Sequence, residues 1–161
     1  MGHGDRVSKI GYMKNRNNAV VTIEEIREII DSRSLENKIN EGFDSQNNEH
    51  FTYIEVFHGD TKLMLDLAGE YTIYFGDWHG HYYTDEIHDM REFRQVLEDL
   101  LDSKICSVGC FRERDNVENW CGSFIEFKEN LDRDYFQRQY GCDRIIRCKF
   151  FDETLNREFL T

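Results

Sequence analysis

The segment from residue 51 to residue 75 alternates apolar and polar side chains with a period of two, and this pattern constrains the fold more than any other. It predicts three strands, 51–57, 62–67 and 71–75, separated by two short turns that each contain a glycine. Strands that follow one another through such short turns pair antiparallel. The sequence therefore predicts a β-meander in the middle of the chain.

Helical periodicity flanks the meander on both sides. Thr22 and Glu25 have the spacing of a capping box, which predicts a helix that runs to about Arg33. Residues 34–50 are polar and rich in asparagine, so we expect a loop there. After the meander, apolar residues recur at spacings of three and four, which predicts a second helix over 85–102. These residues are Ile87, Met90, Phe93, Leu97, Leu100 and Leu101.

The last third of the chain predicts a second group of strands. Residues 104–111 are expected to pair with 120–127 across a polar loop at 112–119. A short helix over 131–140 ends at a glycine, and 144–151 forms the closing strand. The predicted fold class is therefore α+β. We expect a single, mostly antiparallel sheet of about six strands, the meander plus the hairpin, packed against two to three helices.

Length and cysteine usage bound the class of protein. The 161 residues are the usual size of one domain, so we expect a single domain, 1–161, with 1–21 as a loose N-terminal segment. The five cysteines are odd in number and contain no Cys-x-x-Cys pair, which favours free thiols in a reducing compartment. No apolar run is long enough to span a bilayer. The sequence thus predicts a cytoplasmic protein that is not in a membrane.

The charge balance restricts the partners. Asp and Glu number 32 against 20 Lys and Arg, a formal net charge of −12. A binder of the phosphate backbone needs a basic face, so nucleic acid is not expected as a partner. A basic protein partner is compatible, because opposite potentials speed encounter and suppress wrong partners.

The segment Phe75–Tyr82, with the sequence FGDWHGHY, carries the most chemistry. If the third strand continues, His79 and His81 point to the same face, because side chains alternate along a strand. The first and third strands of a meander flank the second, so their C-terminal ends lie at one edge of the sheet. That edge would bring His58, at the end of the first strand, near Asp77.

One interpretation of this cluster is a divalent metal site. Imidazole nitrogens and carboxylates are common ligands of zinc. The candidate ligands are His58, Asp77, His79 and His81. The corresponding function would be that of a small metal-binding protein or a metal-dependent hydrolase.

Two other interpretations stay open. A histidine could act as the base for a thiol nucleophile, with Cys110 or Cys121 as the thiol, although no nucleophile motif is present. Alternatively the segment is structural: Gly76 and Gly80 permit a bend, the aromatic side chains pack, and the imidazoles bond backbone groups or face solvent.

Three segments in order resemble a known set of proteins. They are Phe75–Tyr82, the Lys-Ile-Cys-Ser-Val run at 104–108 after an acidic amphipathic helix, and Trp-Cys-Gly-Ser at 120–123. This arrangement resembles uncharacterised bacterial proteins with an FGxWHxHY motif, some of which look like immunity proteins encoded beside polymorphic toxins. The resemblance implies no catalytic residue and no cofactor. Its motif residues are candidates for binding, chiefly Trp78, His79, His81, Tyr82 and Trp120.

The hypothesis that combines charge, motif and resemblance is a non-enzymatic, acidic protein-binding module. An immunity-type protein of this kind would neutralise a basic partner such as a cognate toxin domain. The alternative is the metal-binding protein or metal-dependent hydrolase described above.

Overall fold

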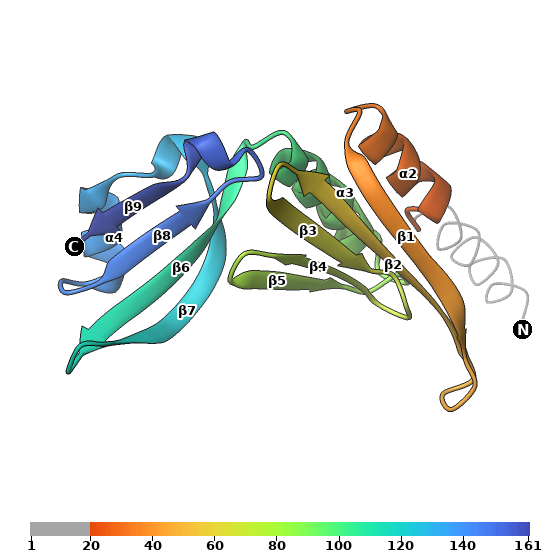
Figure 1. Cartoon of the computed structure of the whole chain (residues 1–161), viewed down its shortest axis with the longest axis horizontal. Coiled ribbons are helices and arrows are strands. Elements are labelled where there is room, and N and C mark those ends of the chain that lie inside the picture. Colours follow the sequence, from red (N-terminus) through yellow and green to blue (C-terminus); the bar gives the residue numbers. More distant parts are fainter. Residues whose placement is uncertain (1–19) are drawn as a thin grey trace, which may run out of the picture.

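The computed structural model describes residues 20–161, in which two antiparallel sheets lie side by side with helices packed on them (Figure 1). The N-terminal sheet has the order β1-β2-β3-β4-β5. Its strands are β1 (Glu36–Asp44), β2 (Glu49–His58), β3 (Thr61–Asp66), β4 (Tyr71–Phe75) and β5 (Trp78–Tyr82). The C-terminal sheet has the order β7-β6-β8-β9. Its strands are β6 (Ile105–Arg114), β7 (Val117–Phe127), β8 (Ile145–Lys149) and β9 (Arg157–Leu160).

Three α-helices and two short 3₁₀ turns complete the described part of the chain. The helices are α2 (Ile23–Asp31), α3 (Ile87–Leu101) and α4 (Arg133–Tyr140), and the turns are Lys128–Asn130 and Glu153–Leu155. Among residues 20–161, none of the helices is both long and apolar enough to cross a lipid bilayer.

The α+β class, with antiparallel strands packed against helices, is confirmed, and so are its main elements. The meander is present as β2, β3 and β4, and β4 has the predicted bounds. The capping box of α2 is also present: the Glu25 amide donates to Thr22 Oγ1 at 3.2 Å, and the Thr22 amide donates to Glu25 Oε2 at 2.8 Å. The predicted loose segment 1–21 falls almost wholly outside the described residues.

The expectation of a single sheet of about six strands is wrong in detail, because residues 20–161 form nine strands in two sheets. The predicted loop at 34–50 contains β1, an edge strand whose polar side chains mostly face solvent. Most of the predicted loop at 112–119 belongs to the paired strands β6 and β7. Only Asp115 and Asn116 form the turn between them, and both have left-handed backbone conformations with positive φ. Strand β9 was not predicted at all.

Each sheet has its own core. On the N-terminal sheet, the buried side chains of β2 and β3 point to the face that carries α2 and α3. This core includes Ile26, Ile54, Leu65, Phe93 and Leu97, all completely buried. On the C-terminal sheet, the fully buried Phe136 of α4 covers a second cluster. That cluster includes Cys106, Val108, Ile146 and Cys148.

The turn between β4 and β5 joins the two sheets. A Cβ on Gly109 of β6 would lie 2.7 Å from Asp77 Oδ2, and one on Gly76 would lie 2.9 Å from Ser107 Oγ. Phe151, which follows β8, is buried in the N-terminal core beside Phe75, with ring centroids 6.3 Å apart. The Phe75–Tyr82 segment therefore sits where the two sheets meet.

Candidate functional site

Strand β5 divides the Phe75–Tyr82 motif between the two faces of the N-terminal sheet. It pairs antiparallel with β4, so that His79 lies opposite Tyr74 and His81 lies opposite Thr72. Trp78 is half-buried and Tyr82 is buried on the helix side, whereas His79 and His81 are exposed on the other side. The prediction that the two histidines share a face is confirmed.

Trp78 and Tyr82 belong to the core. Trp78 packs against the N-terminal core, and Tyr82 contacts Phe93 of α3 with ring centroids 5.5 Å apart. Burial, with a further contribution from the carboxylates of Glu92 and Asp89, raises the pKa of the Tyr82 hydroxyl well above its usual value. Of the five predicted binding residues, these two are therefore placed where they stabilise the fold.

His79 and His81 form a small cluster on the outer face. Their ring centroids are 5.1 Å apart and the two ring planes are nearly perpendicular. The ring centroid of His79 also lies 5.8 Å from that of Tyr74. His81 Nδ1 is 3.0 Å from a carboxylate oxygen of Glu70 and 3.1 Å from the hydroxyl of Thr72. These polar partners hold the His81 ring in place on the sheet.

The four candidate metal ligands are not brought together. His58 lies against Phe151, with ring centroids 5.7 Å apart, and Asp77 lies 3.9 Å from Lys149 Nζ. Within residues 20–161, no three His, Cys, Asp or Glu side chains come close enough to hold a metal ion. The physical reason is the turn at Gly76, which reverses the chain, so that β5 carries its histidines away from the edge where β2 ends.

The candidate thiols lie on a different sheet from the histidines. Cys110 is buried at the rim of the C-terminal core, where burial is the main cause that raises its thiol pKa. Cys121 is exposed on β7, and its thiol donates a hydrogen bond to the backbone oxygen of Asn119. In the part of the chain that the structure describes, no hydrogen bond joins either thiol to a histidine. The predicted pairing of Cys110 or Cys121 with a histidine base is therefore not present in residues 20–161.

The outer side of the N-terminal sheet carries a band of partly exposed apolar and polar residues, which we call the open face. The described helices pack on the opposite side, and the outward residues of β2, β3 and β4 are mostly half-buried or exposed. The open face includes Tyr53, Glu55, Met64, Asp66, Tyr74, His79 and His81, and Phe57, Lys62 and Thr72 lie on the same side. Met64, Tyr74 and His79 are direct cross-strand neighbours, so they form a continuous row.

Sequence reasoning did not identify Tyr53, Met64 and Tyr74 as candidate residues. The signal was present, because these residues occupy the positions between the inward-facing Ile54, Leu63, Leu65 and Ile73 of the meander. A meander with large apolar residues at both sets of positions has two apolar faces. The two predicted helices cover one face, which leaves the other open.

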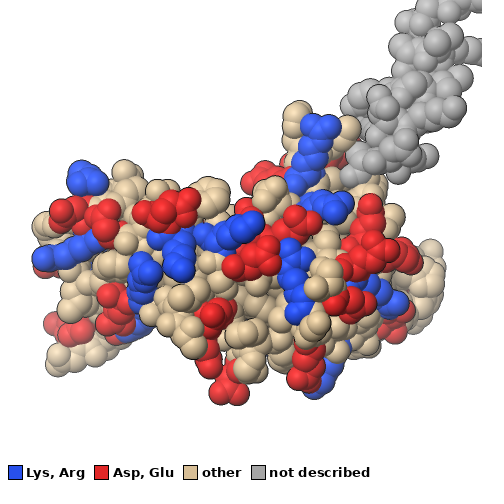
Figure 2. All heavy atoms as spheres, turned by 90° about the horizontal axis from the view of Figure 1, so that it is seen from above, with Lys and Arg blue, Asp and Glu red and all other residues tan. Residues whose placement is uncertain are grey.

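The acidic excess lies in one part of the chain. Residues 20–102 contain 20 acidic and six basic side chains, whereas residues 103–161 contain 11 acidic and ten basic ones. On the side of the molecule seen in Figure 2, red and blue side chains are interspersed rather than separated into two fields. The half with the N-terminal sheet is thus strongly acidic as a whole, without one concentrated patch on that side.

Trp120 is the fifth predicted binding residue, and it lies apart from the other four. It is on β7, an edge strand of the C-terminal sheet, and 60% of its surface is exposed. A tryptophan exposed to this degree contributes little to a core and is available for contacts.

Comparisons of the chain with protein-family models, with curated proteins and with solved structures find no match. The resemblance to immunity proteins stays a prediction from the motif.

Proposed function

We propose that the chain is a non-enzymatic protein-binding module that docks a basic protein partner on the open face of the N-terminal sheet. The observation that carries this proposal is the row of Met64, Tyr74 and His79, three neighbouring side chains on a sheet face that the described helices leave uncovered. Tyrosine and methionine are enriched at protein interfaces, where they supply large contact areas.

The chemistry of the open face suits a mixed, apolar and polar contact. Tyr74 is 37% exposed, and its neighbour Met64 is half-buried, so both can lose further surface to a partner. Asp66 and Glu55 lie on the same face, next to the aromatic residues. Glu55 pairs with Lys62 at 2.8 Å, whereas Asp66 makes no ion pair within residues 20–161. Carboxylates around an apolar centre are the arrangement expected for a partner with Lys or Arg at its rim.

The charge of the module favours a basic partner. The excess of acidic side chains in residues 20–102 creates a negative field over the half that carries the open face. Such a field raises the association rate of a basic protein and disfavours acidic ones. A toxin domain with a basic surface, bound in the cytoplasm by an immunity-type protein, is the partner that the motif resemblance suggests.

The test is a binding titration between the purified chain and the purified product of the adjacent gene. Tyr74→Ala and Met64→Ala should each weaken binding by roughly tenfold, because central interface side chains contribute ~1–2 kcal/mol or more. Phe127→Ala is the matched control, since Phe127 is 49% exposed on the other sheet. Absence of binding at low salt, or an equal loss with Phe127→Ala, would refute the proposal.

A further inference from the structure

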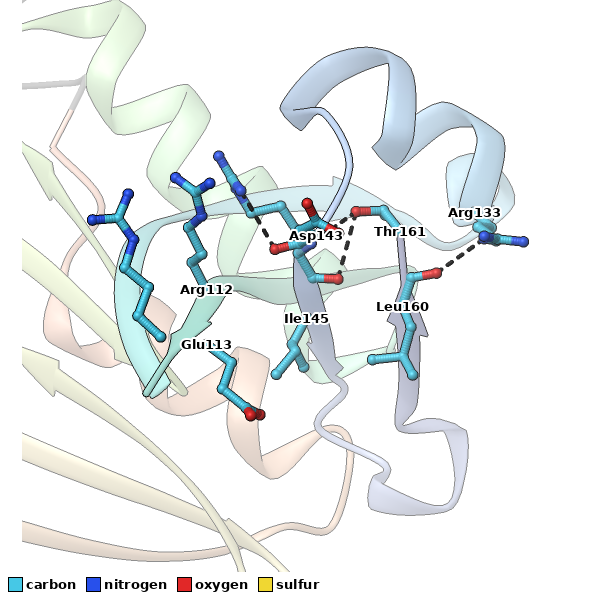
Figure 3. A pocket seen from close by; sticks show the side chains of 9 residues that line it. Arg112, Glu113, Arg133, Asp143, Ile145, Leu160 and Thr161 are labelled. Carbon is cyan, nitrogen blue, oxygen red and sulfur yellow. Dashed lines mark hydrogen bonds between the residues drawn. The ribbon is translucent and has the colours of Figure 1, made fainter. Parts of the chain in front are cut away.

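A second candidate site lies on the C-terminal sheet, at the end where β6 stops, β8 begins and β9 ends. A pocket of about 570 Å³ opens there (Figure 3). Four arginines line it: Arg112 and Arg114 from β6, Arg133 from the first turn of α4, and Arg144 just before β8. They form a concentration of positive charge in a chain whose net charge is −12.

Unlike several other arginines of the chain, the four pocket arginines have no carboxylate partner within residues 20–161. Arg27, Arg33 and Arg147 each lie within 3.1 Å of a carboxylate oxygen. Within residues 20–161, none of the four pocket arginines has a carboxylate oxygen within 4.0 Å. The positive charge of their guanidinium groups is therefore not paired with a carboxylate, and most of their N–H donors make no hydrogen bond within residues 20–161.

The bonds that the pocket arginines do make are to backbone oxygens. Arg133 Nε donates to the Leu160 carbonyl at 2.9 Å, and Arg144 Nη1 donates to the Cys142 carbonyl at 3.2 Å. These contacts orient the side chains without neutralising them. Each guanidinium has five N–H donors, so several remain for a ligand.

The two acidic side chains of the pocket lining form no ion pair with the arginines in the described part of the chain. Glu113 follows Arg112 on β6, and Figure 3 shows their side chains pointing to opposite sides of the strand. Asp143 lies in the turn before β8, with a left-handed backbone (φ 61°), and it makes no ion pair in the described chain. The pocket arginines are thus not held in direct ion pairs within residues 20–161.

The end of β9 fixes the position of Arg144. The Arg144 amide donates to Thr161 Oγ1 at 3.1 Å, and the Thr161 amide donates to the Arg144 carbonyl at 3.0 Å. The Thr161 hydroxyl in turn donates to the Gly141 carbonyl at 2.8 Å. Arg112 and Arg144 are half-buried, so part of each side chain is already shielded from water. Ile145 and Leu160 add an apolar wall.

We propose that this pocket binds a small phosphate-bearing anion with at least two negative charges. Guanidinium groups bind phosphate through pairs of parallel N–H···O bonds, and they bind it more specifically than a point charge does. Mutual repulsion among neighbouring cations that lack a carboxylate partner is relieved when an anion binds between them. The pocket volume also falls in the range of small-molecule sites, about 300–1,000 Å³. This site and the open face use different residues, so either proposal can fail without the other.

The test is calorimetric titration of the full chain with pyrophosphate and with ADP, in parallel with citrate and single-stranded RNA. Arg112→Gln and Arg144→Gln should each weaken pyrophosphate binding by roughly tenfold or more, because each removes charge-assisted bonds. The affinity of Arg144→Lys for pyrophosphate should lie between those of Arg144→Gln and the native chain. Lysine keeps the positive charge but lacks the planar guanidinium that donates two parallel hydrogen bonds. The matched control is Arg138→Gln, an exposed arginine of α4 outside the pocket lining.

A second readout does not depend on the variants. Cys121 is exposed and lies beside Arg112, Arg114 and Arg144, so bound pyrophosphate should slow its alkylation. Saturable pyrophosphate binding that Arg112→Gln weakens and Arg138→Gln leaves intact supports the proposal. Three results overturn it: no binding of pyrophosphate or ADP at low salt, equal losses with Arg138→Gln, or binding of citrate or RNA that is tighter than that of either phosphate ligand.

Discussion

The indole of Trp78 lies across Gly80, two residues further along the same edge strand. A Cβ on Gly80 would stand 2.6 Å from Trp78 Cζ2 and 3.0 Å from the Tyr82 hydroxyl oxygen. The three residues share the inward face of β5, so the glycine provides the space in which the indole covers the sheet. Gly80 is therefore required because a side chain at this position would collide with the indole. Its backbone conformation does not require glycine, since other residues can adopt it.

Gly80→Ala should destabilise the fold by about 1–3 kcal/mol, the usual cost of an extra methyl group in a packed site. Urea unfolding measures this loss. In a Trp78→Leu background, the same substitution should cost less, because the shorter side chain leaves room for the new methyl group. Equal penalties in the two backgrounds would show that the Trp78 contact does not determine the effect.

The alternation of apolar and polar residues predicted those strands that have one buried and one exposed face. Strand β4 has Tyr71, Ile73 and Phe75 on the buried side, and its bounds were predicted correctly. Strand β1 lacks this signal, because it is an edge strand with only Ile39 and Phe43 as large apolar residues. The pairing of β1 depends on its partner strand: the ring of Phe51 in β2 covers Gly42, and this contact is not visible in the sequence of either strand alone.

The candidate site was only partly predictable for a similar reason. That His79 and His81 share a face follows from the period of a strand. Their separation from His58 depends on the reversal at Gly76 and Asp77, a two-residue glycine-containing turn that is itself a hairpin signal. The arginine pocket could not be predicted, because Arg112, Arg133 and Arg144 come from three separate segments that only the folded chain brings together.

Asp102→Asn should lower stability at neutral pH by up to about 1 kcal/mol, a modest value because the ion pair is partly exposed. Arg33 reaches from the end of α2 to Asp102 at the end of α3, with two bonds of 2.7 and 3.0 Å. The hydrogen bond from Arg33 is the main cause that holds the pKa of the Asp102 carboxyl below its usual value.

The pH dependence follows from the sign of that shift. A carboxyl with a lowered pKa in the folded state stabilises the fold above its unfolded pKa, and this stabilisation is lost as pH falls through the folded pKa. Asp102→Asn should therefore matter at neutral pH and have little effect in strong acid. Urea unfolding at both pH values checks this, with Asp85→Asn, outside any ion pair of residues 20–161, as the control. A loss that persists unchanged in acid would contradict the prediction.

Two of the five thiols should react with a thiol reagent in the native protein. Cys121 and Cys142 are exposed, whereas Cys106, Cys110 and Cys148 are buried. The pKa of the Cys106 thiol is also raised, first by its hydrogen bond with Cys148 and then by burial, so little thiolate is present to react. A timed assay with a chromogenic disulfide should show two fast thiols and three that react only after unfolding. More than two fast thiols would show that the C-terminal core opens readily.

The two tryptophans should respond differently to the same tests. Trp78 is half-buried against the N-terminal core, whereas Trp120 is 60% exposed on an edge strand. Acrylamide should therefore quench the fluorescence of the Trp78→Phe variant, which retains Trp120, more strongly than that of the Trp120→Phe variant. Trp78→Ala should cost roughly 3 kcal/mol, at the lower end for a large core residue, and Trp120→Ala less than about 0.5 kcal/mol. Equal quenching of the two variants, or a large loss of stability with Trp120→Ala, would mean that Trp120 is packed against the fold and is not available to a partner.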